Sequence, residues 1–286
     1  MRIGAVCGFL AATLFLMPTL IFGQSKRSKS DKNIDLVGHR NIDRELNNYS
    51  LDDEKRIGKR MAEQAAKSYK FVTDPGVIGY LERVDQKLEQ NSDKHIPMTL
   101  HVIDSDDVAR PLTAMAGQLF VTRGLLFHMD NEGELASLLA RAIAVTALRS
   151  QTTLATQAQQ IVITDALSDP GFSPSEGPVI TMPPPMATLH TTPGSVFDAD
   201  YFGIQYVYKS GYDPSCFLQY VQQVGETSKT FPPIPKRLKE LQKEIAEILP
   251  KRDENIVTTP EFQQFKSRLQ ALAPQGVASR PPGSKR

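Results

Sequence analysis

The chain of 286 residues contains no tryptophan and few aromatic residues, which make up 7% of it. Proteins that stack nucleic-acid bases rely on aromatic rings, so this shortage argues against such a surface. The 33 lysine and arginine residues nearly balance the 32 acidic ones and leave a net charge of +1. A surface that binds a phosphate backbone needs an excess of basic residues. We therefore expect no nucleic acid among the partners.

Cysteine is scarce too, because Cys7 and Cys216 are the only two. Cys7 lies in an apolar run, residues 3–22, which follows Arg2 and precedes a polar stretch. This pattern predicts a secretory signal peptide over residues 1–23 and a secreted or periplasmic protein. The run is also long enough to span a bilayer, so an uncleaved anchor facing outside the cytoplasm is the alternative. Cleavage would leave Cys216 without a disulfide partner, as a small buried apolar side chain.

Several common catalytic motifs are missing. The sequence has no G-x-S-x-G, no Walker loop and no Cys-x-x-Cys, so hydrolase, nucleotide-binding and redox functions of those types lack support. The composition is that of an ordinary globular protein, 40% hydrophobic and 23% charged. Any membrane contact is expected only through residues 3–22, and only if they stay uncleaved.

Hydrophobic periodicity predicts a mainly α-helical α+β fold with a small β-sheet. Ser50 and Asp74-Pro75 are typical starts of helices, and a long apolar helix is predicted over residues 131–149. The β-branched and apolar runs 98–103 and 118–122 predict two strands. Further helices are predicted over residues 195–207, from after Pro214 to about 225, and over 237–249 and 260–269.

The domain organisation follows from shifts in composition. Residues 24–48 are polar and predict a linker, and residues 49–229 predict the main domain. A loop with seven prolines, residues 169–193, interrupts that domain, since proline cannot sustain a helix or a central strand. C-terminal helices are expected over residues 230–270. The tail 271–286, rich in Pro, Gly and basic residues, is expected to be disordered.

A set of segments in the same order resembles peptidase family M forty-eight, the HtpX, BepA and CAAX prenyl protease group of zinc peptidases. The resemblance covers residues 49 to 269 and implies a zincin-like fold. Its segments are 50–54, 101–105, 120–126, 130–136, Ala199-Asp200 with Gly203, 210–214 and 261–269.

The zinc ligands of that family are replaced in this chain. The resemblance puts Arg141, Ala142 and Val145 in register with the family's H-E-x-x-H, in which two histidines four residues apart share a helix face. Val196 stands at the position of the third ligand, a glutamate. Phe231 stands where the family has a histidine before a proline. Two further segments, Ala109-Arg110-Pro111 and Met115-Ala116-Gly117, are reduced versions of the family's substrate-binding edge.

Zinc in a catalytic site needs three protein ligands that offer N, O or S atoms. Valine offers none, an arginine cation repels the ion, and Ala142 cannot move a proton. We expect no zinc cofactor and no hydrolysis at these positions. Asp200, which the family retains beside its metal, would be costly to bury alone. We therefore hypothesise that Arg141 and Asp200 form a structural ion pair in place of the metal, or else that both face solvent.

Metal ligands elsewhere in the chain are the alternative. His128, Asp130, Glu132 and Glu134 are close in sequence, although acids at a helix start are expected to serve the helix dipole. His190, Asp198 and Asp200 form a second, looser set, in which His190 lies in the Pro-rich loop.

The resemblance together with its departures predicts an exported, catalytically inactive peptidase homologue that acts as a binding or regulatory module in the cell envelope. Its partner would be a protein or an unfolded polypeptide. The alternatives are an active metalloendopeptidase that uses relocated or unconventional ligands, and a product with no specific surviving role.

Overall fold

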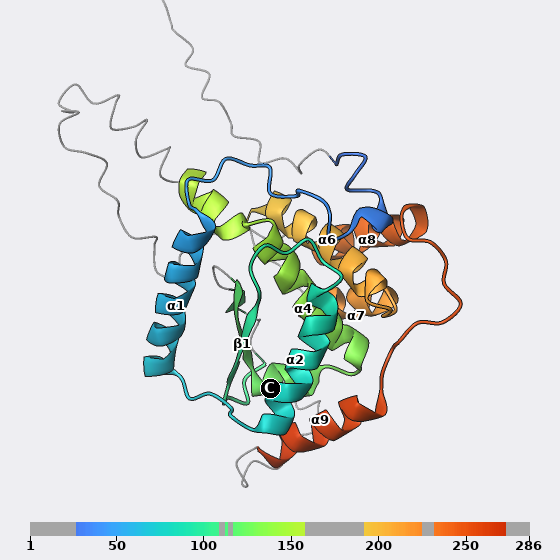
Figure 1. Cartoon of the computed structure of the whole chain (residues 1–286). Helices are drawn as coiled ribbons and strands as arrows, with labels where there is room; N and C mark the ends of the chain where they lie inside the picture. The colour runs from blue at the N-terminus through green and yellow to red at the C-terminus, as the bar shows by residue number, and fades with distance from the viewer. Residues whose placement is uncertain (1–26, 109–111, 114–116, 158–191, 225–231, 273–286) are drawn as a thin grey trace, which may run out of the picture.

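The computed structural model describes residues 27–108, 112–113, 117–157, 192–224 and 232–272. They form a mainly helical fold with one small sheet, which confirms the predicted α+β class (Figure 1). The predicted signal peptide, nearly all of the Pro-rich loop, Phe231 and the tail from residue 273 lie outside the described residues.

The sheet has three strands in the order β1-β3-β2. Strand β1 (Thr99–Ile103) runs parallel to β3 (Gln118–Thr122), and the two-residue strand β2 (Leu112–Thr113) runs antiparallel to β3. The sequence predicts β1 and β3 but not β2, which is too short to show alternation. Neighbouring residues of a strand face opposite sides. Leu119 and Val121 accordingly join the main core, while Phe120 packs with Ala65 of α1 on the other face.

Side-chain caps fix the starts of the helices. Helix α1 (Leu51–Ser68) begins at Ser50, whose side chain accepts from Asp53 N while the Asp53 carboxylate accepts from Ser50 N. Helix α2 (Pro75–Glu89) begins at Asp74 and helix α4 (Glu132–Ala147) at Asn131, both with capping bonds. These bonds satisfy backbone donors that the first helical turn leaves free. Four further helices complete the C-terminal part of the chain, namely α6 (Pro193–Lys209), α7 (Ser215–Val224), α8 (Ile234–Glu247) and α9 (Pro260–Ala271).

Helix α4 is the centre of the molecule. Every one of its residues is buried except Arg141. It packs against α2, α6 and α7, while α8 lies on α6 and α7, and α9 lies on α2 and the short helix α3 (Arg123–His128) (Figure 1). Leu241 of α8 and Phe262 of α9 belong to the same hydrophobic cluster as α4. The C-terminal helices therefore share one core with the main domain.

The N-terminal segment, defined as residues 27–48, differs from the linker that its polar composition predicts. It crosses the top of the molecule beside α6 in Figure 1 and buries Ile34, Val37 and Ile42 in the main core. Arg40 in the same segment is also buried. The expectation of a linker is wrong for these residues, because a few apolar side chains and one buried ion pair suffice to hold a polar segment against the fold.

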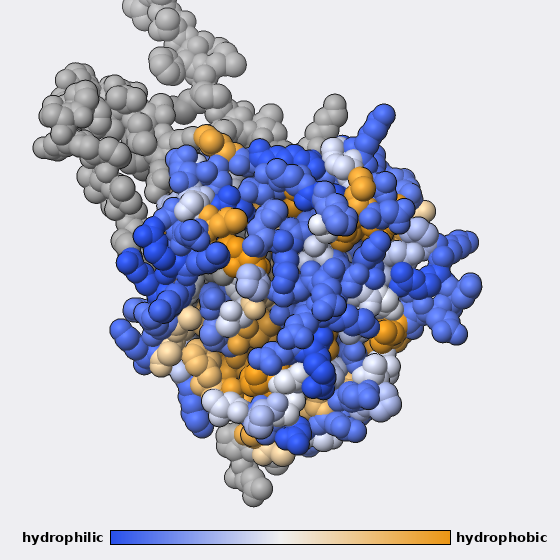
Figure 2. All heavy atoms as spheres, viewed as in Figure 1, coloured by the Kyte–Doolittle hydropathy of each residue, from blue (hydrophilic) through white to orange (hydrophobic). Residues whose placement is uncertain are grey.

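The surface seen in Figure 2 is largely hydrophilic, with hydrophobic residues gathered between α1 and α2, over the sheet. Met61 and Phe71 pack on the α1 side of the sheet and are partly buried. Among the described residues, none of the helices combines the length and the apolar character needed to cross a membrane.

Candidate functional site

The pair of helices α4 and α6 carries the positions at which the sequence predicts a dismantled metal centre. The two helices approach closely at Gly203, where an added Cβ would lie 3.1 Å from Arg141 Cα. A side chain at this position would require Arg141 or Phe217 to shift by a few tenths of an ångström. The approach brings Arg141 of α4 beside Asp200, which lies almost one turn before Gly203 on α6.

The other positions of the predicted metal centre carry apolar side chains. Ala142 and Val145 of α4 and Val196 of α6 are all buried, and Val196 is completely inaccessible to solvent. Their side chains contain no nitrogen, oxygen or sulfur atom, and Arg141 is a permanent cation, so these residues do not fit a zinc ion. Phe231 lies outside the described residues.

A three-residue charge cluster, Arg141, Asp200 and Arg237, occupies this part of the α4–α6 pair. Arg141 Nε lies 3.0 Å from Asp200 Oδ1. Arg237 of α8 donates two hydrogen bonds to the same carboxylate, from Nε to Oδ2 at 2.7 Å and from Nη2 to Oδ1 at 2.8 Å. Burial alone would lower the pKa of Arg237, but the Asp200 carboxylate offsets this and raises it above its usual value. The fork from Arg237 therefore compensates the charge of Asp200, which is almost fully buried.

The acids at the start of α4 are bound to other groups. Glu132 accepts from Tyr212 Oη at 2.8 Å and also from the Thr259 hydroxyl. Glu134 accepts from Asp130 N at 2.9 Å and from Asn131 Nδ2, and burial raises its pKa. These bonds close the first turn of α4 and tie it to the N-terminus of α9.

The second predicted set, His190 with Asp198 and Asp200, is divided. His190 lies outside the described residues, Asp198 pairs with Arg27 Nη2 at 2.7 Å, and Asp200 belongs to the charge cluster. Within the part of the chain that the structure describes, no three His, Cys, Asp or Glu side chains lie together in a way that could hold a metal ion.

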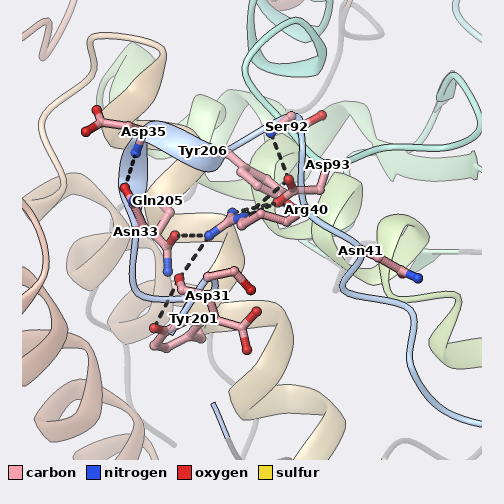
Figure 3. A network of polar contacts seen from close by, with 12 residues as sticks. Asp31, Asn33, Asp35, Arg40, Asn41, Ser92, Asp93, Tyr201, Gln205 and Tyr206 are labelled. Atoms are coloured by element: carbon pink, nitrogen blue, oxygen red, sulfur yellow. Dashed lines mark hydrogen bonds and ion pairs between the residues drawn. The ribbon is translucent and has the colours of Figure 1, made fainter. Parts of the chain in front are cut away.

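A buried polar network connects the N-terminal segment to α6 and α8 (Figure 3). Arg40 donates from Nη2 to Asp93 Oδ2 at 2.5 Å and from Nη1 to Gln205 Oε1 at 2.7 Å. Tyr206 Oη donates to Asp93 Oδ2 at 3.0 Å. Gln205 Nε2 donates to Glu244 Oε1 of α8 at 3.0 Å. Burial raises the pKa of Glu244 well above its usual range. The network thus holds one ion pair and one acid, Glu244, whose neutral form is favoured by burial.

A small cavity of about 80 Å³ lies between the N-terminal segment, the residues 148–157 that follow α4, and the start of α6. Its walls include Arg27, Arg44, Asp198 and Thr153. It can hold a few water molecules but is far smaller than the pockets that bind drug-sized ligands.

No protein-family model matches the chain. Over 193 residues, or 63% of its length, it is 23% identical to a beta-barrel assembly-enhancing protease from Yersinia pestis. This similarity supports a distant relationship to the family M forty-eight peptidases. The matched region makes up 39% of the Yersinia protease, so the chain spans well under half of that relative.

Two functional groups of this region are not predicted from the sequence. In the sequence, Arg237 is marked only by the pair of prolines before it. Its two bonds reach Asp200, which is 37 positions away. Arg40 lies in a stretch that reads as a linker. Neither position stands out, because the partners of a buried charge are set by tertiary packing and leave no local pattern.

Proposed function

We propose that the protein is an exported metallopeptidase relative that has lost its catalytic centre and acts as a binding or regulatory module in the cell envelope. The observation that carries the proposal is the chemistry of four positions. Ala142, Val145 and Val196 offer only hydrocarbon, and Arg141 repels cations. Loss of a general base alone costs about 10²–10⁴ in rate, and loss of three ligands leaves no metal-bound water to activate.

The intact fold around these positions supports a binding role rather than the absence of any specific role. The helix pair still meets at Gly203, and the buried charge of Asp200 is still compensated by Arg237. The relative's name concerns β-barrel assembly. We therefore propose an unfolded envelope polypeptide, or an envelope protein under assembly, as the partner, and a secreted or periplasmic location.

The test compares the protein with a variant in which the ligands are restored. The purified wild type should contain no stoichiometric zinc by mass spectrometry of the metal and should leave casein intact. A variant that combines Arg141→His, Ala142→Glu, Val145→His and Val196→Glu should acquire zinc if these positions correspond to the family's ligands. Stoichiometric zinc in the wild type, together with proteolysis that a chelator abolishes, would refute the proposal.

A further inference from the structure

The charge cluster at Asp200 carries a surplus positive charge. Arg237 alone supplies two hydrogen bonds and one full charge to the Asp200 carboxylate. Arg141 adds a second guanidinium to the same acid, through a third bond at 3.0 Å. The other acid near this cluster, Glu244, is bonded by Gln205, and burial favours its neutral form. One carboxylate therefore stands against two cations.

Arg141 also has unused donors. Arg40 and Arg149, the comparable arginines of this fold, each donate from all three guanidinium nitrogens. Arg141 donates only from Nε, and its Nη1 and Nη2 atoms bond no residue within the described ranges. A buried or half-buried cation with unused donors is unfavourable unless a ligand or water satisfies it.

Arg141 is also the least buried residue of α4. All other residues of that helix are buried, whereas the Arg141 side chain keeps 14% of its surface exposed. A small anionic group can therefore approach the exposed part of this side chain from solvent. The planar fork of the two Nη atoms matches the two oxygens of a carboxylate.

We propose that Arg141 binds the C-terminal carboxylate of an extended polypeptide, held at the place where the peptidase relatives of this chain hold their metal. The inference rests on the proposed function, because it names the chemical group through which a bound polypeptide would be recognised. Arg237 keeps Asp200 compensated, so the Nη fork of Arg141 stays available to the ligand.

The test measures binding of one peptide made with a free or an amidated C-terminus to the purified protein, by fluorescence anisotropy at low salt. The free acid should bind about tenfold more tightly than the amide, which is the effect of one charge-assisted hydrogen-bond pair. Arg141→Gln should remove this difference. The control Arg56→Gln should keep it, because Arg56 lies on the exposed face of α1 and pairs with Asp53 on the same helix.

A second measurement separates this inference from the proposed function. The Nε–Hε signal of Arg141 in a nitrogen-15 spectrum is titrated with acetate and, in parallel, with inorganic phosphate. A saturable shift with acetate supports the site even if no peptide binds, in which case only the polypeptide role fails. An unmoved signal or a stronger response to phosphate than to acetate would overturn the carboxylate site, and so would equal affinities for acid and amide when both peptides bind measurably. Thermal unfolding should show that Arg141→Gln remains folded, because the bonds from Arg237 to Asp200 stay in place.

Discussion

Removal of the Arg40 side chain should destabilise the whole protein, although Arg40 lies in a segment that reads as a linker. Arg40 and Asp93 both have 0% exposed side chains, and their closest atoms are 2.5 Å apart. The substitution Arg40→Met keeps most of the side-chain volume but leaves the Asp93 carboxylate without a cation. Breaking a buried ion pair from one side costs about 3–5 kcal/mol. Asp93 retains bonds from Gly38 N and Tyr206 Oη, which places the expected loss near the lower end of that range.

Urea unfolding followed by far-ultraviolet circular dichroism measures this loss, since the chain has no tryptophan to report by fluorescence. The matched control is Arg44→Met in the same segment. Arg44 pairs with Asp31, whose side chain is only 2% exposed, but the Arg44 side chain is 37% exposed and Asp31 keeps a bond from Ser28 N, so the loss there should be clearly smaller than for Arg40→Met. Equal losses for the two variants, or a loss below about 1 kcal/mol for Arg40→Met, would refute the view that the N-terminal segment is part of the core.

Three further predictions concern other buried groups. Arg237→Met should lower the free energy of unfolding by about 3 kcal/mol, and Arg141→Gln should lower it by only about 1 kcal/mol. The difference arises because Arg237 supplies two of the three bonds to Asp200. The reverse order of the two losses in urea unfolding would contradict this. Burial raises the pKa of Asp85 from 3.8 to about 7, so the folded state binds an extra proton between these values and stability should fall as the pH rises through them; Asp85→Asn should flatten this slope in thermal melts. Burial raises the pKa of the Cys216 thiol to about 12, so Ellman's reagent should react with it at pH 8 only after denaturation, and fast labelling of the folded protein would show that the thiol is accessible.

Local signals predict much of the fold. Ser50, Asp74 and Pro260 mark the observed starts of α1, α2 and α9 to within a residue, because a cap or a proline at the first position acts through its own neighbours. The helix predicted over residues 131–149 corresponds to α4 for the same reason. Strand β2 and helix α3 are missed, since two and six residues are too few for periodicity to be read.

The sequence predicts the apolar positions of the site and one of its ion pairs, but not its other buried charges. Ala142, Val145 and Val196 follow from their places in the family register, and the structure finds all three buried. The sequence also suggests Arg141 and Asp200 as partners, and their nitrogen and oxygen atoms lie 3.0 Å apart. The ion pairs of Arg237 and Arg40 are not predicted. Each arginine contacts a carboxylate on a distant part of the chain, and the residues around it show no pattern that would indicate the contact.

The contacts of Arg40 imply an order of events during synthesis. Its partners Asp93 and Gln205 follow it by 53 and 165 residues, so the arginine leaves the ribosome long before they exist. Closing such long loops is entropically costly and slow compared with local helix formation. The contact of Arg40 with Gln205 can therefore form only after α6 has been made. Among the described residues, some of the first to be translated are thus among the last to reach their native neighbours.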